Sequence, residues 1–432
     1  MKRAIHTINQ LMHNRIPGQL VIQVTDRCNA TCPQCGMRVT ETFTRHTLKT
    51  DDIKRIIDAA AAKSFQAVSF TGGETLLHPR ELARLITYAG RAGIPYIRTG
   101  TNGFLFQRPE KPDFTKRVSA LVEMLAATPL RNFWISIDSH VDHLHEQMRG
   151  LQNVMAGIEK ALPIFHAAGL YPSANLGVNR NVGGRHTQAL FPAKGLSASS
   201  YLDLFENTFF SALCRFYRKV IDMGFTMVNT CYPMSIDEDE MAHNLEAVYP
   251  ASSVDRIVRF SPAEKARLFA ALLRAVDLFR SRIRIFSPLS SLHALMQSHR
   301  NEKKNSGAAF ACRGGIDFFF INCRDGATYP CGYRGQENMG TFWDLDLSAF
   351  HHPHCTLCDW ECFRDPSELL GPLMEMMRFP VSAVKRCQKN GKKFKRWLQD
   401  ITYYQACDFF DGRKPMNQQK VGTWKRMARL LK

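Results

Sequence analysis

The segment "DRCNATCPQCGMR", residues 26–38, places three cysteines within eight positions near the start of a 432-residue chain. Cys28, Cys32 and Cys35 are four and three positions apart, so their sulfurs can point at one centre. Such a short run suits a metal ion or a cluster better than a network of disulfides. Three thiolates leave a four-coordinate centre with one open position, which is where metal centres do chemistry.

The composition is that of a folded protein whose cysteines stay reduced. With 45% hydrophobic residues, the chain can bury a real core, and its length predicts two domains with appendages. No apolar run approaches the roughly 18–20 residues of a membrane helix, and the N-terminal residues do not read as a signal peptide. We therefore expect a cytoplasmic protein, in which 13 cysteines indicate metal ligation over disulfides.

The net charge of +18 indicates an affinity for anions. Part of the excess is local, because residues 385–432 hold 14 Lys and Arg against three Asp. This tail reads either as a solvated basic surface or as a contact for RNA or an anionic lipid surface.

Residues 20–230 alternate strand-like runs with longer helical stretches. The predicted strands are 20–25, 67–71, 96–102, 132–138, 173–179 and 225–230. The stretch 51–64 repeats its apolar residues at helical spacing, and 79–93 opens with proline and closes with glycine, as helices do. Six β–α units predict a parallel sheet, and right-handed crossovers make it either doubly wound or a barrel.

Residues suited to chemistry follow the predicted strands and favour the barrel. Cys28 follows the first strand, Gly72-Gly73-Glu74 the second and Thr101-Asn102-Gly103 the third, while Asp138 and Asn179 end the fourth and fifth. The carboxyl ends of parallel strands share one rim, where barrels place their active sites. The sequence therefore predicts a catalytic face there.

The glycine-rich element decides between two metals at the first cysteine cluster. Zinc would need a fourth ligand, for which His46 is the nearest candidate. A [4Fe-4S] cube on three thiolates leaves one iron free to chelate an amino acid. In "FTGGETLLHP", residues 70–79, the glycines let backbone approach a ligand closely and Glu74 can accept hydrogen bonds from an ammonium group. Together these features describe a pocket for the methionine end of S-adenosylmethionine (SAM).

The three cysteines and "GGE" resemble the motifs of radical SAM enzymes, and the resemblance covers roughly residues 18–235. It implies a partial (β/α)6 TIM-type barrel in which a [4Fe-4S] cluster passes one electron to SAM. The resulting 5′-deoxyadenosyl radical abstracts a hydrogen from the substrate, and the protein supplies placement and dryness. The resemblance also implies a reductant such as flavodoxin or ferredoxin.

Site residues carry over by position. Cys28, Cys32 and Cys35 match the cluster ligands. The matched SAM contacts are Gly72, Gly73, Glu74, Ser136, Asp138, Asn179 and Arg149. One departure is Gln34, which stands before the third cysteine where the family often has an aromatic residue.

A second cluster lies between Cys312 and Cys362, which span six cysteines. The stretch "FFFINC", "RDG" and "ATYPC" predicts a hairpin, and Cys312-x13-Gly326-x4-Cys331 resembles the SPASM and twitch auxiliary-cluster modules of radical SAM enzymes. That resemblance assigns an auxiliary [4Fe-4S] cluster to Cys312, Cys331, Cys355 and Cys358. Cys323 and Cys362 are spare ligands, or belong to a further cluster completed by Cys387 or Cys407. A structural zinc on the same four cysteines is the alternative.

These motifs divide the chain into an N-terminal extension (1–19), a barrel core (20–235), a helical segment (236–305) with a linker at 301–307, an auxiliary-cluster domain (306–365) and a helical basic tail (366–432). Cys214 is expected in the core, and Cys231, at the end of the sixth predicted strand, is a candidate for facing the substrate. We expect a radical SAM oxidoreductase or maturase acting on a peptide, a protein or a small metabolite. The rival hypotheses are a radical SAM enzyme acting on RNA and a non-enzymatic zinc-binding nucleic-acid or scaffold protein.

Overall fold

The computed structural model describes residues 15–192, 195–233, 235–236, 241, 244–248, 255–300, 310–349, 355–381, 385 and 391–430. Most of the expected N-terminal extension, the linker at 301–307 and Cys387 lie outside these residues. Within them, no helix is both long enough and apolar enough to span a bilayer.

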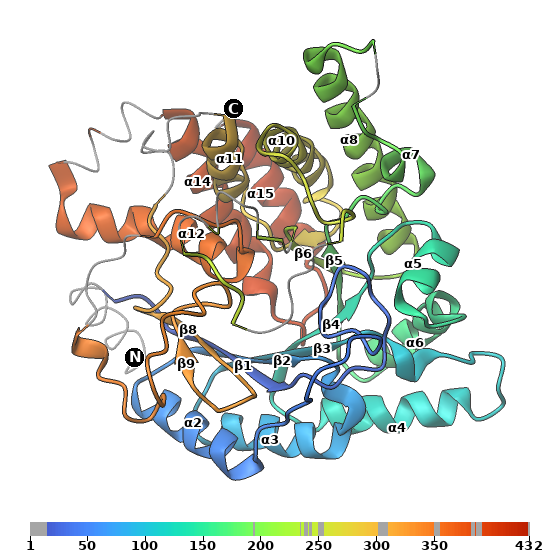
Figure 1. Ribbon diagram of the computed structural model, residues 1–432, viewed down its shortest axis with the longest axis vertical. Helices are drawn as coiled ribbons and strands as arrows, with labels where there is room; N and C mark the ends of the chain where they lie inside the picture. Colours follow the sequence, from blue (N-terminus) through green and yellow to red (C-terminus); the bar gives the residue numbers. More distant parts are fainter. Residues whose placement is uncertain are drawn as a thin grey trace.

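The six predicted strands form one parallel sheet, as expected. They are β1 (Gln19–Thr25), β2 (Ala67–Gly72), β3 (Tyr96–Thr101), β4 (Leu130–Ser136), β5 (Ser173–Gly177) and β6 (Met227–Cys231). The full sheet has the order β7-β6-β5-β4-β3-β2-β1-β8-β9, with β7 at Arg284–Ile285. Strands β7 and β9 are its two edges and, within the described residues, do not pair with each other, so the sheet is curved but open (Figure 1). The expected partial barrel is confirmed.

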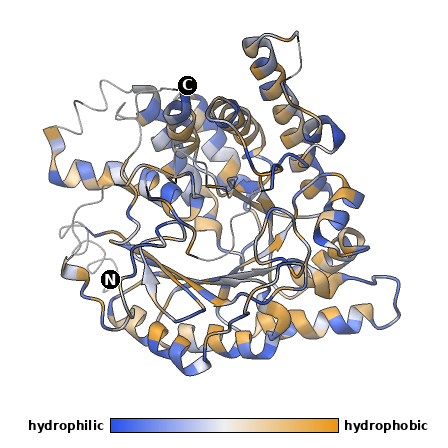
Figure 2. Ribbon diagram, in the orientation of Figure 1, coloured by the Kyte–Doolittle hydropathy of each residue, from blue (hydrophilic) through white to orange (hydrophobic). Residues whose placement is uncertain are grey.

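Amphipathic helices cover the outer face of the sheet (Figure 1). In chain order these are α2 (Thr50–Ala62), α3 (Pro79–Arg91), α4 (Phe114–Ala126), α5 (Asp142–Arg149) and α6 (Val154–Ala167). Helix α2 shows why the sequence folds this way, since Ile53, Ile56, Ile57 and Ala60 all fall on its buried side. Apolar residues alternate with polar ones along each of these helices (Figure 2).

The cysteine-rich region continues the barrel sheet. Strand β8 (Phe318–Ile321) pairs in parallel with β1, in register from Gln19 opposite Phe318 to Ile22 opposite Ile321. Strand β9 (Thr328–Tyr329) returns antiparallel to β8, which confirms the predicted hairpin. Val21 of β1 packs in the same hydrophobic cluster as Cys312, Cys331 and Cys358.

The remaining helices pack against the β5–β7 end of the sheet and around the cysteine-rich region. They are α7 (Arg185–Gln188), α8 (Ala198–Asp222), α10 (Pro262–Phe279), α11 (Leu289–Arg300), α12 (Glu361–Arg378), α14 (Gly391–Ala406) and α15 (Gln418–Leu430). The amphipathic stretches at 200–224 and 261–280 form α8 and α10. Helix α10 starts with a capping box between Ser261 and Glu264.

The basic tail contributes to the core as well as to the surface. Asp400 and Arg280 form a fully buried ion pair of 3.0 Å that joins α14 to the end of α10. Tyr403 and Trp424 are also buried, together with Met227 of β6. The exposed side of α15 carries lysines and arginines, so the solvated-surface reading holds for that side only.

Candidate active site at the carboxyl ends of the strands

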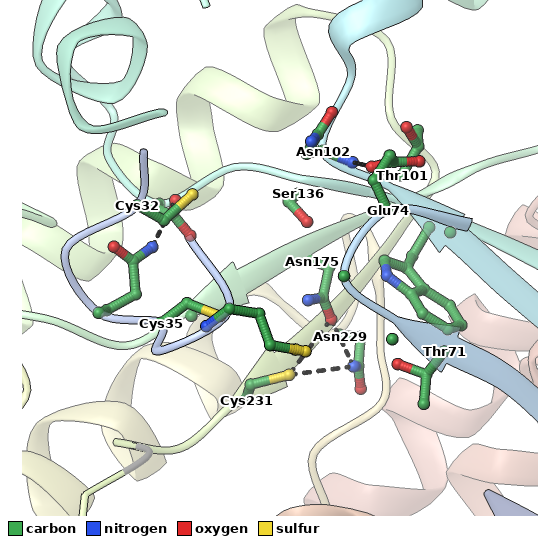
Figure 3. Close-up of a pocket in the computed structure, with 18 of the residues that line it drawn as sticks. Cys32, Cys35, Thr71, Glu74, Thr101, Asn102, Ser136, Asn175, Asn229 and Cys231 are labelled. Atoms are coloured by element: carbon green, nitrogen blue, oxygen red, sulfur yellow. Dashed lines mark hydrogen bonds between the residues drawn. The ribbon is translucent and has the colours of Figure 1, made fainter. Parts of the chain in front are cut away.

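A cavity of 250 Å³ opens at the carboxyl ends of the barrel strands. Nine of the ten residues predicted to hold the first cluster and SAM line it, namely Cys28, Cys32, Cys35, Gly72, Gly73, Glu74, Ser136, Asp138 and Arg149. Figure 3 shows Cys32 and Cys35 on one side of the cavity and Glu74 and Asn102 on another. The rim predicted from the strand ends is thus one continuous surface.

The cysteine loop between β1 and α2 presents its sulfurs to backbone donors. The N–H of Ala30 donates to Cys28 Sγ at 3.5 Å, and that of Met37 donates to Cys35 Sγ at 3.4 Å. Such bonds favour the thiolate form that binds metals. Arg45 holds the loop together by donating to the carbonyls of residues 26, 37, 38 and 41.

Burial keeps these thiols neutral unless a cation arrives. It raises the pKa of Cys32 to about 12 and that of Cys35 to about 11. A metal centre would supply the missing positive charge, because coordinated thiols lose their protons. His46, the candidate fourth zinc ligand, instead has Nδ1 at 3.3 Å from Asp26 Oδ2 and is not among the residues that line the cavity.

Gly72 and Gly73 are required by the approach of the cysteine loop. A Cβ on Gly73 would lie 2.0 Å from the carbonyl oxygen of Arg27, and one on Gly72 equally close to that of Thr25. The N–H of Gly73 donates to the Thr25 carbonyl at 2.8 Å, and that of Glu74 donates to the Arg27 carbonyl at 2.8 Å. The two motifs are therefore joined directly by backbone hydrogen bonds.

Glu74 places a buried carboxyl group at the wall of the cavity. Its Oε1 accepts from the N–H of Leu76 at 3.0 Å, and its Oε2 accepts from that of Asn102 at 2.6 Å. Burial nevertheless raises the pKa of Glu74 to about 7. A cationic ligand in the cavity would favour the carboxylate, as expected for a residue that meets an ammonium group.

Asp138 and Arg149 form an ion pair at the cavity wall. Asp138 Oδ2 lies 2.7 Å from a terminal nitrogen of Arg149 and accepts from Gln34 Nε2 at 3.0 Å. The other polar atom of Gln34, Oε1, is buried and has no hydrogen-bond partner. An orphaned acceptor at the cavity wall fits a ligand with a donor group, such as the amines of SAM.

Asn179 does not line the cavity, unlike the other predicted contacts. Its amide nitrogen donates to the carbonyls of Asp138 at 3.1 Å and Gly177 at 2.6 Å. Its oxygen accepts from the N–H of Asn181 at 2.7 Å. The residue fixes the loop after β5, and its side chain is already fully engaged.

Sequence reasoning missed the residues that form the floor of the cavity. They project from the strands themselves and include Ser69, Arg98, Trp134, Asn175 and Asn229. Asn229 donates to Asn175 Oδ1 at 2.6 Å beside Cys231, as Figure 3 shows. The available signal was period-two alternation, because Arg98 and Gly100, and likewise Trp134 and Ser136, line the cavity two positions apart.

The four cysteines assigned to the auxiliary cluster come together. Burial raises the pKa of Cys358 well above its usual value, and the neighbouring thiols of Cys331, Cys355 and Cys312 raise it further. The N–H of Cys312 donates to the Cys355 carbonyl at 2.7 Å. Backbone N–H groups also donate to Cys312 Sγ and Cys331 Sγ, both at 3.4 Å, as at the first cluster.

A buried guanidinium accompanies these four thiols. Burial lowers the pKa of Arg364, but the thiols of Cys312 and Cys358 raise it above the usual value. Its Nε has no partner. This donor set fits a negatively charged iron–sulfur cluster with Arg364 as a counter-charge. Across the described ranges, no three ligand-type side chains are arranged to hold one metal ion; in a cube, each cysteine binds its own iron.

The remaining candidate cysteines, Cys323, Cys362 and Cys407, do not lie with the four auxiliary-cluster cysteines. The Cys323 N–H donates to Gln23 Oε1 at 3.3 Å, and the Cys323 thiol lies beside Asp26. Cys407 is buried in the tail core beside Tyr403. Cys362 lines the first cavity, where Cys231 also lies, and its thiol donates to Glu361 Oε1 at 3.4 Å. As expected, Cys214 is a buried core residue.

Comparisons with known proteins agree with this geometry over the barrel. Residues 22–175 match the model of the Radical SAM superfamily. The AdoMet-dependent heme synthase of Methanosarcina barkeri is 29% identical over 147 residues, which are 33% of this chain and 38% of that protein. The GTP 3′,8-cyclase of Syntrophomonas wolfei is 30% identical over 158 residues, 35% of this chain and 44% of that protein. The chain thus spans about two fifths of the length of these curated relatives.

Among solved structures, anSMEcpe with bound AdoMet is similar at a TM-score of 0.47 and 14% identity, over 76% of this chain and 79% of that one. Streptococcus suis SuiB gives a TM-score of 0.49 and 16% identity, over 81% and 70%. The matched barrel residues include all three loop cysteines and the glycine pair before Glu74. Residues 22–175, just over a third of the chain, therefore form a radical SAM domain.

Proposed function

We propose that this protein is an enzyme that cleaves SAM reductively and modifies its substrate by hydrogen abstraction. The observation that carries the proposal is the convergence of Cys28, Cys32, Cys35 and Glu74 on one cavity. The three thiols of this one loop fit a cluster with one open iron, and the neighbouring carboxyl group fits the amine of a bound amino acid.

Each residue of the site has a role in this proposal. The three cysteines hold the cluster, Glu74 and Gln34 Oε1 accept hydrogen bonds from SAM, and Arg149 keeps Asp138 in place. When bound, the cluster supplies one electron to the sulfonium, whose cleavage gives methionine and a 5′-deoxyadenosyl radical. The cavity walls surround that radical, which limits its reaction with hydrogen donors other than the substrate.

The second group of cysteines, Cys312, Cys331, Cys355 and Cys358, holds an auxiliary [4Fe-4S] cluster in this proposal. Trp360 lines the SAM cavity only two residues after Cys358, so the two proposed clusters approach the same space. An electron lost by a substrate radical therefore has a nearby acceptor. A reductant such as flavodoxin or ferredoxin supplies the first electron, and the substrate is a peptide, a protein or a small metabolite.

The test is anaerobic reconstitution followed by iron and sulfide analysis and a search for 5′-deoxyadenosine after adding SAM and a strong reductant. Cys32→Ala should abolish 5′-deoxyadenosine formation, whereas Cys331→Ala should retain it and lose product formation. Cys214→Ala is the control, because that thiol is buried in the core away from the cavity. Zinc without iron in the purified protein, or wild-type protein that forms no 5′-deoxyadenosine, would refute the proposal.

A further inference from the structure

The floor of the cavity carries an arginine that forms no ion pair with any acid among the described residues. Arg98 projects inward from β3 and lines the cavity beside Trp134 of β4. Its guanidinium lies 5.1 Å from the centre of the Trp134 ring and 5.6 Å from that of Phe286. The Nε atom is buried and makes no hydrogen bond. Because the two aromatic rings position the Arg98 side chain, the N–H groups of its guanidinium remain available to bind a ligand.

The acids that line the cavity are all engaged elsewhere. Glu74 accepts two backbone N–H groups, and Asp138 is paired with Arg149. Glu361 accepts from the thiol of Cys362 and lies beside that of Cys231. Among the described residues, none of these carboxyl groups forms an ion pair with Arg98. Arg98 is half-buried and its buried Nε has no acceptor, so its place is best explained by a ligand that brings an anion.

The neighbouring residues define what accompanies that anion. Gly100 follows Arg98 on the inward face of β3, and a Cβ there would lie 2.2 Å from Trp134 Nε1. The glycine therefore lets the indole lie against the strand as a flat apolar surface. Asn175 and Asn229 supply amide groups on the adjoining strands (Figure 3). Charge, ring and amides together form a site for a flat or apolar group with an anionic substituent.

We propose that Arg98 binds a carboxylate or phosphate of the substrate, with the adjacent part of the substrate resting on Trp134. The inference rests on the proposed function, because it makes the floor of the cavity the substrate site and leaves the cysteine rim to SAM. A planar guanidinium takes either anion in bidentate fashion, which fixes the orientation of the substrate as well as its charge. Substrates without an acidic group are thereby disfavoured.

The experiment is equilibrium dialysis of the full-length, anaerobically reconstituted protein against radiolabelled benzoate and, separately, inorganic phosphate at fixed ionic strength. Saturable binding of one probe per chain is expected, and the preferred probe identifies carboxylate or phosphate as the anion. Arg98→Gln should weaken that binding about tenfold or more, the effect of losing a charge-assisted hydrogen bond. Arg98→Lys, which keeps the charge, should lose less. Arg324→Gln is the control, because Arg324 is exposed and lies outside the cavity.

Equal binding by wild type and Arg98→Gln would overturn the inference, and so would competitive displacement of the probe by SAM, which would assign Arg98 to the cofactor. Wild-type 5′-deoxyadenosine formation is measured separately. Its absence would refute the proposed function, whereas its presence without anion binding would refute the Arg98 site alone.

Discussion

Gly73→Ala should separate the cysteine loop from the sheet. The new Cβ would lie 2.0 Å from the carbonyl oxygen of Arg27, whereas ordinary contact begins at 3.4 Å, so the two backbones must move apart by more than an ångström. The movement breaks the hydrogen bonds from Gly73 to Thr25 and from Glu74 to Arg27, both of 2.8 Å. Gly73 has no positive φ, so the effect is steric contact rather than backbone strain.

The loss can be estimated from those two bonds. At about 1 kcal/mol for each buried backbone hydrogen bond, and with a similar amount for the displaced loop, the local structure should lose about 2–3 kcal/mol. That is enough to depopulate the arrangement in which three thiols meet. Because the auxiliary cysteines lie elsewhere, only one of two clusters should be affected.

Iron and sulfide analysis after anaerobic reconstitution measures this directly. Wild type should bind about eight irons per chain, as two [4Fe-4S] clusters require, and Gly73→Ala about half as many, with little 5′-deoxyadenosine. Gly422→Ala is the matched control, since a Cβ there meets nothing within 4 Å. Full iron content and unchanged SAM cleavage in Gly73→Ala would show that the close approach of the two motifs is not needed.

Two further predictions concern buried charges. Asp400→Asn should lower the free energy of unfolding by about 3–5 kcal/mol, because it leaves Arg280 buried without its partner; urea unfolding followed by circular dichroism measures it, and a loss below 1 kcal/mol would contradict the structural role of the tail. SAM affinity should rise as pH increases from about 6 to 8, because burial raises the pKa of Glu74 to about 7 and only the carboxylate attracts an ammonium group. Anaerobic dialysis against labelled SAM provides the profile, in which Glu74→Gln should bind weakly and lose this rise; an identical profile in both proteins would exclude Glu74 as its source.

The strands and the rim could be predicted because their signals are local. Period-two runs bounded by turn residues give the strands, and parallel strands necessarily bring their carboxyl ends together. Cys28 and Glu74 could therefore be placed at one site without knowledge of packing.

The floor of the cavity and the spare cysteines could not be predicted, because their surroundings depend on long-range packing. Arg98 sits within a strand, where a charged residue reads as an edge or surface position. Asn179 ends a predicted strand as Asp138 does, yet it turns to bond the loop backbone. Cys362 lies four residues after Cys358, but α12 begins at Glu361, between them. The side chain of Cys362 therefore lines the SAM cavity, away from the other auxiliary cysteines. Tertiary packing decided each of these positions.

The pairing of β1 with β8 has a consequence for any attempt to divide the chain. Nearly every residue of β1 is buried, and both of its sides are occupied, by β2 and by β8. Cutting away the C-terminal portion would convert this interior strand into a long apolar edge, which invites other chains to add on. The truncated barrel should therefore aggregate, and for the same reason the spacing between the two cysteine groups is set by neighbouring strands and cannot vary as it would across a hinge.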